Sequence, residues 1–258
     1  MIPDEGGGTR MEQKIALVTG GMGGIGTAIC RALHQAGIKT IASYNKGGHH
    51  EEALTWQDQQ KSENYSFDII YADVTDAQSC EAIIQKIEKD LGPIDILVNN
   101  AGITRDATCS KMKLDEWKTV IDTNLNSVFY VTHCVISEMI KRHYGRIINI
   151  SSINGQKGQF GQVNYAAAKA GMHGFTKALA LEVARKGITV NTISPGYVAT
   201  KMVMAVPENI RTEILSQIPV GRFAMPEEIA HVVVFLADER STYITGANIA
   251  INGGQYMM

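Results

Sequence analysis

The chain has 258 residues, of which 45% are hydrophobic and 19% charged, with a formal net charge of −2. This length is enough for one α/β domain with a single large core. Because 24 Lys and Arg stand against 26 Asp and Glu, there is no broad positive field for a polyanion, and we expect neither nucleic acid nor an anionic membrane surface as a partner.

Targeting and metal signals are missing from the sequence. No run approaches the roughly 18 apolar residues of a membrane-spanning helix, and the first residues do not show the basic-then-apolar order of a signal peptide. The four cysteines are widely spaced, with no pattern of metal ligands. We therefore expect a cytoplasmic protein with reduced thiols and no metal site.

Short β-rich runs alternate with segments of helical length along the chain. Residues 1–13 include a Gly-Gly-Gly run and no apolar period, which predicts a disordered extension before one domain over 14–258. Nearly continuous Ile, Leu and Val runs indicate strands covered on both faces. The alternation predicts a doubly wound, Rossmann-type parallel sheet of about seven strands, with strands at 15–19, 39–43, 66–71, 94–99, 146–151, 189–193 and 248–251 and, for example, a helix at 77–91.

The first predicted strand runs directly into a glycine-rich turn, GGMGGIG, which a helical pattern follows. Glycines there let backbone N–H groups and a helix N-terminus approach a pyrophosphate. A purely structural turn is the alternative, and the glycine spacing is wider than the usual GxGxxG. The predicted dinucleotide-binding residues are Gly20, Gly23, Gly24, Ile25 and Gly26.

The end of the second strand indicates which dinucleotide binds. An acidic residue there would hold the 2′-hydroxyl of NAD and repel the 2′-phosphate of NADP. Here Asn45 and Lys46 follow the strand, and the first acid is Glu51. The segment favours NADP(H), although a loop lysine of this kind can simply be solvated.

Three side chains in the second half of the chain have the pattern of a carbonyl-reducing site. Tyr165 and Lys169 are four residues apart in a helical run, so they share one face. The lysine ammonium would stabilise the phenolate and lower the tyrosine pKa. Ser152 follows a strand and could donate a hydrogen bond to a substrate carbonyl. Each has an ordinary alternative, a solvated helix face or a cap.

These segments together resemble the short-chain dehydrogenase/reductase family: the glycine turn, the run NNAG at 99–102, Asn124, Ser152, the Tyr165 and Lys169 pair, and Pro195-Gly196. The resemblance covers residue 14 to the C-terminus. It implies that Tyr165 gives a proton to the carbonyl oxygen, that Lys169 binds the nicotinamide ribose, and that Asn124 holds a water in a proton relay.

The same resemblance implies further cofactor contacts and an assembly. The adenosine side would be lined by Asp73, Val74, Asn100, Ala101, Gly102 and Ile103, and the nicotinamide by Pro195, Gly196 and Val198. The family forms homotetramers, so we expect segments 124–140 and 165–184 at one interface. Packing of their small residues within one subunit is the alternative.

Within the family, the segment NGQKGQFGQ at 154–162 is similar to acetoacetyl-CoA reductases of polyhydroxybutyrate synthesis. This implies NADPH-dependent reduction of acetoacetyl-CoA, a 3-oxoacyl-CoA, to (R)-3-hydroxybutanoyl-CoA. Phe160 and Tyr197 would close an apolar slot around a four-carbon chain. The implied substrate-binding residues are Asp106, Ser152, Gln159, Phe160, Gln162 and Tyr197.

The region 195–226 has no regular pattern, and we expect a mobile lid at roughly 197–225. A plain surface insertion is the alternative. Pro207 lies where the similar reductases can have a basic residue, which weakens the case for a coenzyme A anchor on this segment. Cations that could meet coenzyme A phosphates are Arg146, Lys157, Lys201, Arg211 and Arg222.

Two other functions are compatible with parts of this pattern. A 3-oxoacyl-[acyl-carrier-protein] reductase would need basic residues for an acidic carrier, and Arg142 and Lys186 match positions of arginines in those reductases. A non-catalytic, cofactor-sensing relative usually lacks the tyrosine or the lysine. Because both are present here with Asn124 and Ser152, we expect an enzyme.

Overall fold

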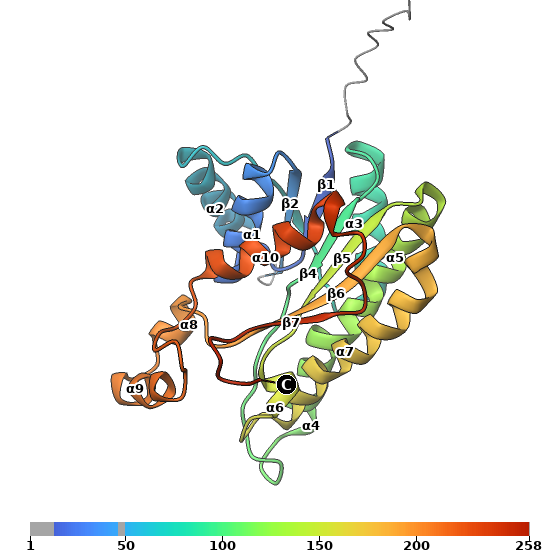
Figure 1. Ribbon diagram of the computed structural model, residues 1–258. Coiled ribbons are helices and arrows are strands. Elements are labelled where there is room, and N and C mark those ends of the chain that lie inside the picture. The colour runs from blue at the N-terminus through green and yellow to red at the C-terminus, as the bar shows by residue number, and fades with distance from the viewer. Residues whose placement is uncertain (1–12, 46–49, 258) are drawn as a thin grey trace, which may run out of the picture.

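One parallel seven-stranded sheet forms the centre of the molecule (Figure 1). The computed structural model describes residues 13–45 and 50–257. The strand order is β3-β2-β1-β4-β5-β6-β7, and every pairing is parallel. The strands are β1 (Ile15–Val18), β2 (Lys39–Tyr44), β3 (Asp68–Tyr71), β4 (Ile96–Asn99), β5 (Gly145–Ile150), β6 (Ile188–Pro195) and β7 (Asn248–Ile251).

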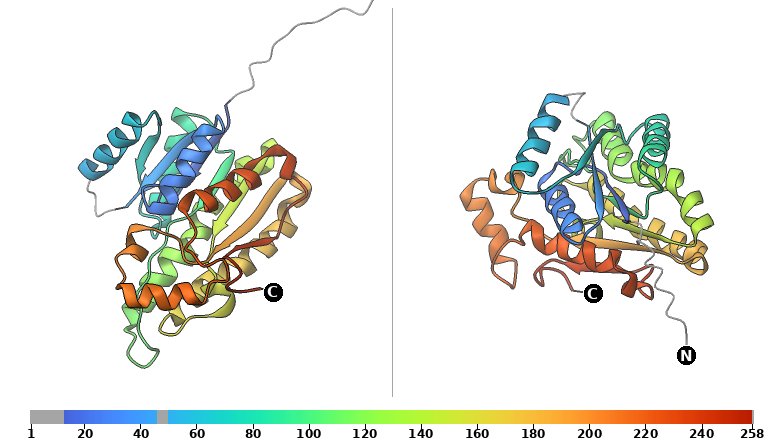
Figure 2. Two further views of the ribbon diagram at one scale, coloured as in Figure 1. Left: turned by 60° about the vertical axis from the view of Figure 1, so that its left-hand side comes forward. Right: turned by 90° about the horizontal axis from the view of Figure 1, so that it is seen from above.

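Helices cover both faces of the sheet (Figure 2). They are α1 (Gly24–Gln35), α2 (His50–Ser62), α3 (Ala77–Asp90), α4 (Leu114–Ile121), α5 (Ser127–Arg142), α6 (Asn154–Lys157), α7 (Val163–Val183), α8 (Lys201–Met204), α9 (Glu208–Ser216) and α10 (Pro226–Ala237), with short turns η1 (Asp122–Asn126), η2 (Ala184–Lys186) and η3 (Glu239–Ser241).

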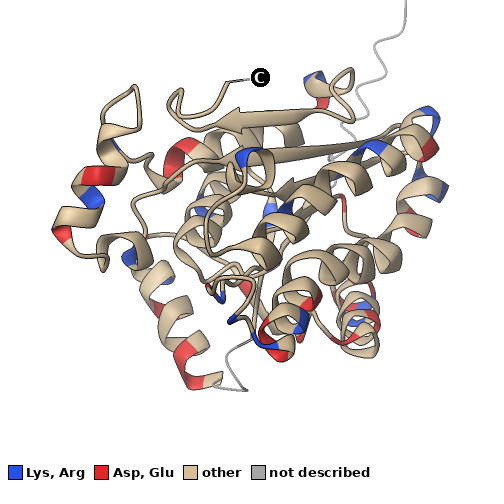
Figure 3. Ribbon diagram, turned by 90° about the horizontal axis from the view of Figure 1, so that it is seen from below, with Lys and Arg blue, Asp and Glu red and all other residues tan. Residues whose placement is uncertain are grey.

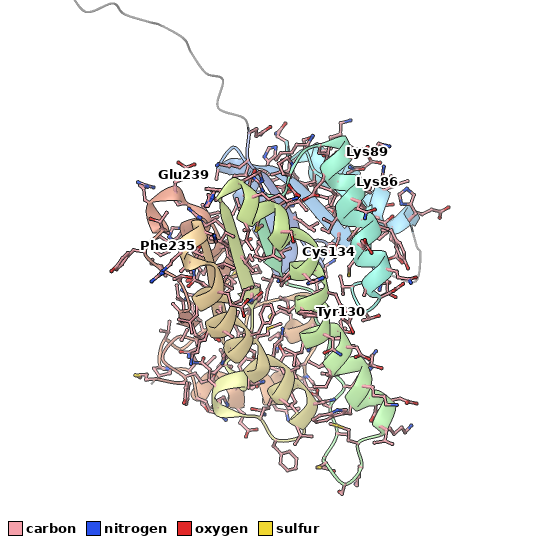
Figure 4. All side chains as sticks on the ribbon, turned by 90° about the vertical axis from the view of Figure 1, so that its right-hand side faces the viewer. Lys86, Lys89, Tyr130, Cys134, Phe235 and Glu239 are labelled. Atoms are coloured by element: carbon pink, nitrogen blue, oxygen red, sulfur yellow. The ribbon has the colours of Figure 1, made fainter. Side chains whose placement is uncertain are left out.

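Alternate residues of one strand enter two different cores. Leu17 packs in the core that α3, α5 and α7 cover, and Val18 packs in the core beneath α1 and α10. Figure 4 looks onto the first layer, where the labels of Tyr130 and Cys134 mark α5 beside α3. Burial on both faces explains the uninterrupted apolar runs. The predicted α/β class, the doubly wound parallel sheet and its seven strands are confirmed.

The strand order reverses between β1 and β4, which places a crevice at their carboxyl ends. The glycine turn, the NNAG run and Ser152 all follow strands that end at this edge. Most strand boundaries lie within one or two residues of their predicted ranges. Residues 1–12, which make up nearly all of the expected extension, and Lys46 lie outside the described residues.

The expectation of an irregular segment at 195–226 was wrong. This segment contains α8 and α9, and a parallel bridge between Val198 and Ala224 closes its base. Both helices are short, with four and nine residues, and neither has a fully buried residue, so the sequence pattern gives only a weak signal there. In Figure 1 both helices project beyond the sheet beside the edge that carries the site.

A buried polar ladder attaches the long helix α7 to the sheet. Asn99 Nδ2 donates to Thr132 Oγ1 at 3.2 Å and to Asn149 Oδ1 at 2.8 Å. Asn149 Nδ2 donates to Thr176 Oγ1 at 2.8 Å, and Thr192 Oγ1 donates to the same oxygen at 2.7 Å. All five side chains are at most 3% exposed. Because buried polar atoms must be paired, the ladder fixes how α7 sits on the sheet.

Candidate active site

The glycine turn after β1 is too tight for side chains at several positions. A Cβ on Gly26 would lie 2.3 Å from Gly20 O, and one on Gly21 would lie 2.7 Å from the Ala42 Cβ. Gly20 has φ of +61°, which L side chains rarely adopt. The first turn of α1 has no acidic residue. This cradle at a helix N-terminus fits a pyrophosphate.

Thr19 and Thr200 support this turn, and the sequence analysis did not identify either one. Thr19 Oγ1 accepts hydrogen bonds from the backbone N–H groups of Asn100 and Ala101 at 3.0 and 3.1 Å. Asn100 Nδ2 donates to the carbonyls of Thr19 and Gly20. A Cβ on Gly24 would meet Thr200 Cγ2 at 3.0 Å. The position of Thr19 between a strand and a glycine turn was the one available signal.

The region expected to receive the adenosine has no carboxylate at the end of β2. Ser43, Tyr44 and Asn45 occupy that end, and the Tyr44 hydroxyl contacts His50 Nδ1. After β3, Asp73 Oδ1 accepts hydrogen bonds from Thr75 N and Oγ1. That carboxylate is partly used in a local turn, and Val74 is packed in the core.

Asn124 links the NNAG run to the catalytic side chains. Its Oδ1 accepts from Ile103 N at 2.8 Å, and its Nδ2 donates to Ile103 O at 2.9 Å. It lies in the π-helical turn η1. A Cβ on Gly102 would be 3.3 Å from Asn124 Oδ1 and 3.4 Å from Lys169 Nζ. The side-chain amide is thus committed to Ile103, and Gly102 leaves room beside both groups.

Lys169 is 3% exposed and has no carboxylate partner among the residues that the structure describes. Its Nζ donates to Ile150 O at 2.8 Å and lies 5.7 Å from the Tyr165 ring centroid. Burial lowers its pKa to about 7, because removal from water disfavours the charged form. The lysine can therefore exchange its proton near neutral pH.

Tyr165 forms a hydrogen bond with Ser152 at the end of β5. Burial raises the tyrosine pKa, the Ser152 hydrogen bond lowers it, and the Asp106 charge raises it. The expected net lowering by Lys169 is absent, since burial outweighs the other effects. A raised pKa keeps the hydroxyl protonated, as a proton donor requires.

The two serines that follow β5 have different partners. Ser151 Oγ donates to Lys169 O at 2.8 Å, so it ties α7 to the strand. Ser152 Oγ accepts from Asn154 N at 3.1 Å and is hydrogen-bonded to Tyr165, so its hydroxyl faces the catalytic tyrosine. The structure brings Asn124, Lys169, Tyr165 and Ser152 together at one sheet edge.

The expected substrate residues separate into two groups. Gln162 Nε2 donates to Asp106 Oδ2 at 2.8 Å. Burial and then the Asp106 charge raise the pKa of Tyr197, so that side chain faces the same region. Gln159 is exposed and Phe160 is 88% exposed. The prediction that Phe160 closes the slot is not met in this structure, because its loop points into solvent.

The end of β6 forms the other wall of this edge. Pro195 O accepts from Ile153 N at 2.8 Å, and a Cβ on Gly196 would lie 2.9 Å from Asn252 Cα. Val198 is buried and pairs with Ala224. These contacts hold the segment after β6 close to the end of β5, where Ser152 lies.

Several cations proposed from the sequence are unsuited to their expected roles. Arg146 is 1% exposed, near the amino end of β5. Arg222 forms a two-pronged ion pair with Glu228, and Arg211 bonds Met204 O. Lys157 and Lys201 remain exposed. Figure 3 shows acidic and basic segments interspersed on this side of the molecule.

The two residues proposed for carrier-protein docking lie away from the site. Arg142 is paired with Asp95 at 2.6 Å and with Ile94 O at 2.8 Å. Lys186 follows the 21-residue helix α7, whose length of roughly 30 Å separates it from Tyr165 at 1.5 Å per residue. Within one chain, these two residues do not form a patch at the site mouth.

The described residues offer neither a metal-binding cluster nor a membrane-spanning helix. Residues 13–45 and 50–257 contain no group of three or more His, Cys, Asp or Glu side chains able to hold a metal ion. None of their helices is both long enough and apolar enough to cross a membrane.

Comparison with known proteins gives consistent matches. Residues 14–211 match the family model of short chain dehydrogenases. Acetoacetyl-CoA reductases of several bacteria are 49% to 56% identical to this chain. That of Rhizobium meliloti is 56% identical, with 94% of this chain and 98% of the relative covered. Nodulation protein G of Azospirillum brasilense is 54% identical, with 95% and 98% covered. A 3-oxoacyl-[acyl-carrier-protein] reductase of Vibrio cholerae is 44% identical, with 96% and 99% covered.

Proposed function

The chain belongs to the short-chain dehydrogenase family, and we propose that it reduces acetoacetyl-CoA with NADPH to (R)-3-hydroxybutanoyl-CoA for polyhydroxybutyrate synthesis. The observation that carries this proposal is the site at the carboxyl ends of β4 and β5. There the protonated hydroxyl of Tyr165 lies against Ser152, and Lys169 lies behind it. Full-length similarity to acetoacetyl-CoA reductases supports the substrate.

NADPH, when bound, supplies a hydride to the carbonyl carbon of the substrate. The cradle at Gly20 to Gly26 fits its pyrophosphate, since a Cβ on Gly21 or Gly26 would clash with neighbouring atoms. The uncharged end of β2 favours the 2′-phosphate, because it places no carboxylate there. NADP specificity also draws on Lys46, which lies outside the described residues.

Side chains of the site stabilise and then protonate the negative charge that develops on the substrate oxygen. Ser152 Oγ accepts from Asn154 N and is hydrogen-bonded to Tyr165, so a substrate oxygen placed between the two hydroxyls would take the serine proton as its hydrogen bond. Tyr165 transfers its hydroxyl proton to the same oxygen, which becomes the 3-hydroxyl group. Lys169 then stabilises the phenolate and returns a proton to it. Asn124 and a bound water would link Lys169 to solvent.

The acyl-carrier-protein alternative is less favoured by the same geometry. Arg142 is already neutralised by Asp95, and Lys186 lies roughly 30 Å along α7 from Tyr165. The exposed Lys157 and Lys201 are suited to coenzyme A phosphates. We further propose a cytoplasmic homotetramer, with α5 and α7 at one interface, and a lid made of α8 and α9.

Product analysis tests the proposed reaction. The protein is incubated with acetoacetyl-CoA and NADPH, cofactor absorbance is followed, and the product is resolved by chiral chromatography after hydrolysis. We expect one NADPH consumed for each (R)-3-hydroxybutanoyl-CoA formed, with NADH much less effective. Formation of the (S) product, or a preference for NADH, would overturn the corresponding part of the proposal.

A further inference from the structure

A chain of hydrogen bonds connects an acidic side chain at the site mouth to the catalytic serine. Asp106 Oδ2 accepts from Gln162 Nε2 at 2.8 Å. Gln162 Oε1 accepts from Asn154 Nδ2 at 2.9 Å, and Asn154 N donates to Ser152 Oγ at 3.1 Å. The orientation of the Gln162 amide is therefore fixed, with its NH₂ group toward the carboxylate.

The backbone holds the same arrangement. Ala107 N donates to Gly161 O at 2.9 Å, and residues Ala107 and Gln162 form an isolated parallel bridge. The segment that follows β4 is thus tied to the segment that precedes α7. Asp106 is held beside the substrate slot by both its side chain and its neighbour's backbone.

The charge of Asp106 reaches both tyrosines of the slot. It raises the pKa of Tyr165 and of Tyr197, in each case as a smaller effect than burial. Its described side-chain partner is an amide rather than a cation. Nearby positive groups are directed elsewhere: Arg105 donates to Thr104 O, and Lys169 donates to Ile150 O. Among the residues that the structure describes, Asp106 therefore has no ion-pair partner, and its negative charge lies at the mouth of the slot.

We propose that Asp106 makes the site selective for 3-oxo thioesters over free 3-oxo acids. A substrate with its keto group at Ser152 and Tyr165 places its C1 carbonyl only two carbons away. In a thioester that carbonyl is neutral, whereas in acetoacetate it is a carboxylate. The proposal rests on the proposed reduction and adds a reason why the unesterified acid is excluded.

The neutral amide of Gln162 supports this selectivity for thioesters over free acids. Because Gln162 donates to Asp106 through one N–H, it holds the carboxylate in place without cancelling its charge. Asp106 is exposed, yet two like charges about 4 Å apart repel each other by about 1 kcal/mol even in water, which is more than thermal energy. A thioester pays no such penalty and can accept hydrogen bonds in the same slot.

The test compares two substrates that differ in charge but hardly in size, acetoacetate and methyl acetoacetate. The ratio of their kcat/KM values with NADPH is measured in the wild type and in Asp106→Asn. An Asn Oδ1 can still accept from Gln162, so only the charge is removed. We expect the wild type to favour the ester strongly and the variant to lower that ratio by about tenfold or more.

Two controls separate charge from structure. Asp115→Asn removes an exposed carboxylate in the first turn of α4 and should leave the ratio unchanged. Raising the salt concentration should lower the wild-type ratio but not that of Asp106→Asn. Asp106→Ser provides a second neutral side chain if the asparagine variant folds poorly, which thermal unfolding would show.

The outcomes distinguish this proposal from the proposed function. The proposed role of Asp106 is overturned if both neutral variants keep the wild-type ratio of kcat/KM for the ester and the acid. It is also overturned if the wild type reduces acetoacetate as well as methyl acetoacetate. Neither result contradicts the reduction of acetoacetyl-CoA. Failure of the wild type to reduce acetoacetyl-CoA overturns the proposed function itself.

Discussion

A buried cation lies at each end of β5, and the two cations have different roles. Near the amino end, Arg146 is 1% exposed and donates to Gly145 O and Gly187 O. At the carboxyl end, Lys169 is 3% exposed and donates to Ile150 O. Neither has a carboxylate partner in the described part of the chain, so backbone carbonyls hold both.

The aromatic neighbour and the chemistry of the cation make the difference. Arg146 Cζ lies 4.6 Å from the Tyr144 ring centroid, and Lys14 Nζ lies 3.6 Å from it, so Tyr144 packs between fixed charges. An arginine does not lose its proton in proteins, whereas the lysine pKa is about 7. Burial of a charge alone therefore does not create an active site. The active site needs a cation that can titrate, Lys169, beside a protonated tyrosine, Tyr165.

Tyr165→Phe should have the largest effect on catalysis. The variant keeps the ring packing and removes the hydroxyl that forms the hydrogen bond with Ser152. We expect acetoacetyl-CoA reduction to fall at least about 100-fold. Fluorescence titration with NADPH should show near-normal cofactor binding. Turnover above about one-hundredth of wild type would show that another group is the proton donor.

Lys169→Met and Arg146→Met form the matched pair that tests the comparison. We expect the first to lose about 100-fold or more in activity while its free energy of unfolding changes little, since removal of a buried cation offsets the loss of the donor to Ile150 O. The second should lose about 2–4 kcal/mol of stability, because two carbonyls lose a donor. Its activity per folded molecule should remain. Denaturant unfolding and steady-state assays distinguish them, and the reverse pattern would refute the division of roles.

The Lys169 pKa also predicts how stability depends on pH. The folded-state pKa is about 7 against an ordinary value of 10.5. Between these values the unfolded chain binds the extra proton, so the free energy of unfolding should rise with pH, by at most ~1.4 kcal/mol per pH unit. Unfolding of wild type and Lys169→Met between pH 7 and 9 tests this. Parallel curves would mean that the folded-state pKa is not lowered.

Thr176→Val should have the smallest effect on activity. It interrupts the buried polar ladder beneath α7 but preserves the volume of the side chain. The Nδ2 group of Asn149 loses its acceptor, and Thr192 loses its partner. We expect a loss of about 1–3 kcal/mol in stability and a modest loss in activity through displacement of α7. The exposed Thr212 of α9, changed in the same way, is the control. Equal stability of the two variants would show that the ladder does not hold α7.

The sequence predicted the elements whose signals are local and repeated. The strands were found because burial on both faces leaves uninterrupted Ile, Leu and Val, and the glycine turn because only glycine fits there. Helices α8 and α9 were missed because they are short and contain no fully buried residue. The pairing of Arg142 with Asp95 joins residues 47 apart, which no local pattern shows. Similarly, the bond from Gln162 to Asp106 joins residues 56 apart.

The two ends of β5 can also be compared for the group that carries the acyl chain, which is either coenzyme A or a carrier protein. A carrier protein would need Arg142 and Lys186, which lie toward the amino ends of the strands, whereas coenzyme A needs only groups near the site. The most direct measurement is kcat/KM with NADPH for acetoacetyl-CoA against acetoacetyl-carrier protein. We predict a clear preference for acetoacetyl-CoA. A large preference for the carrier-protein thioester would contradict the proposed function.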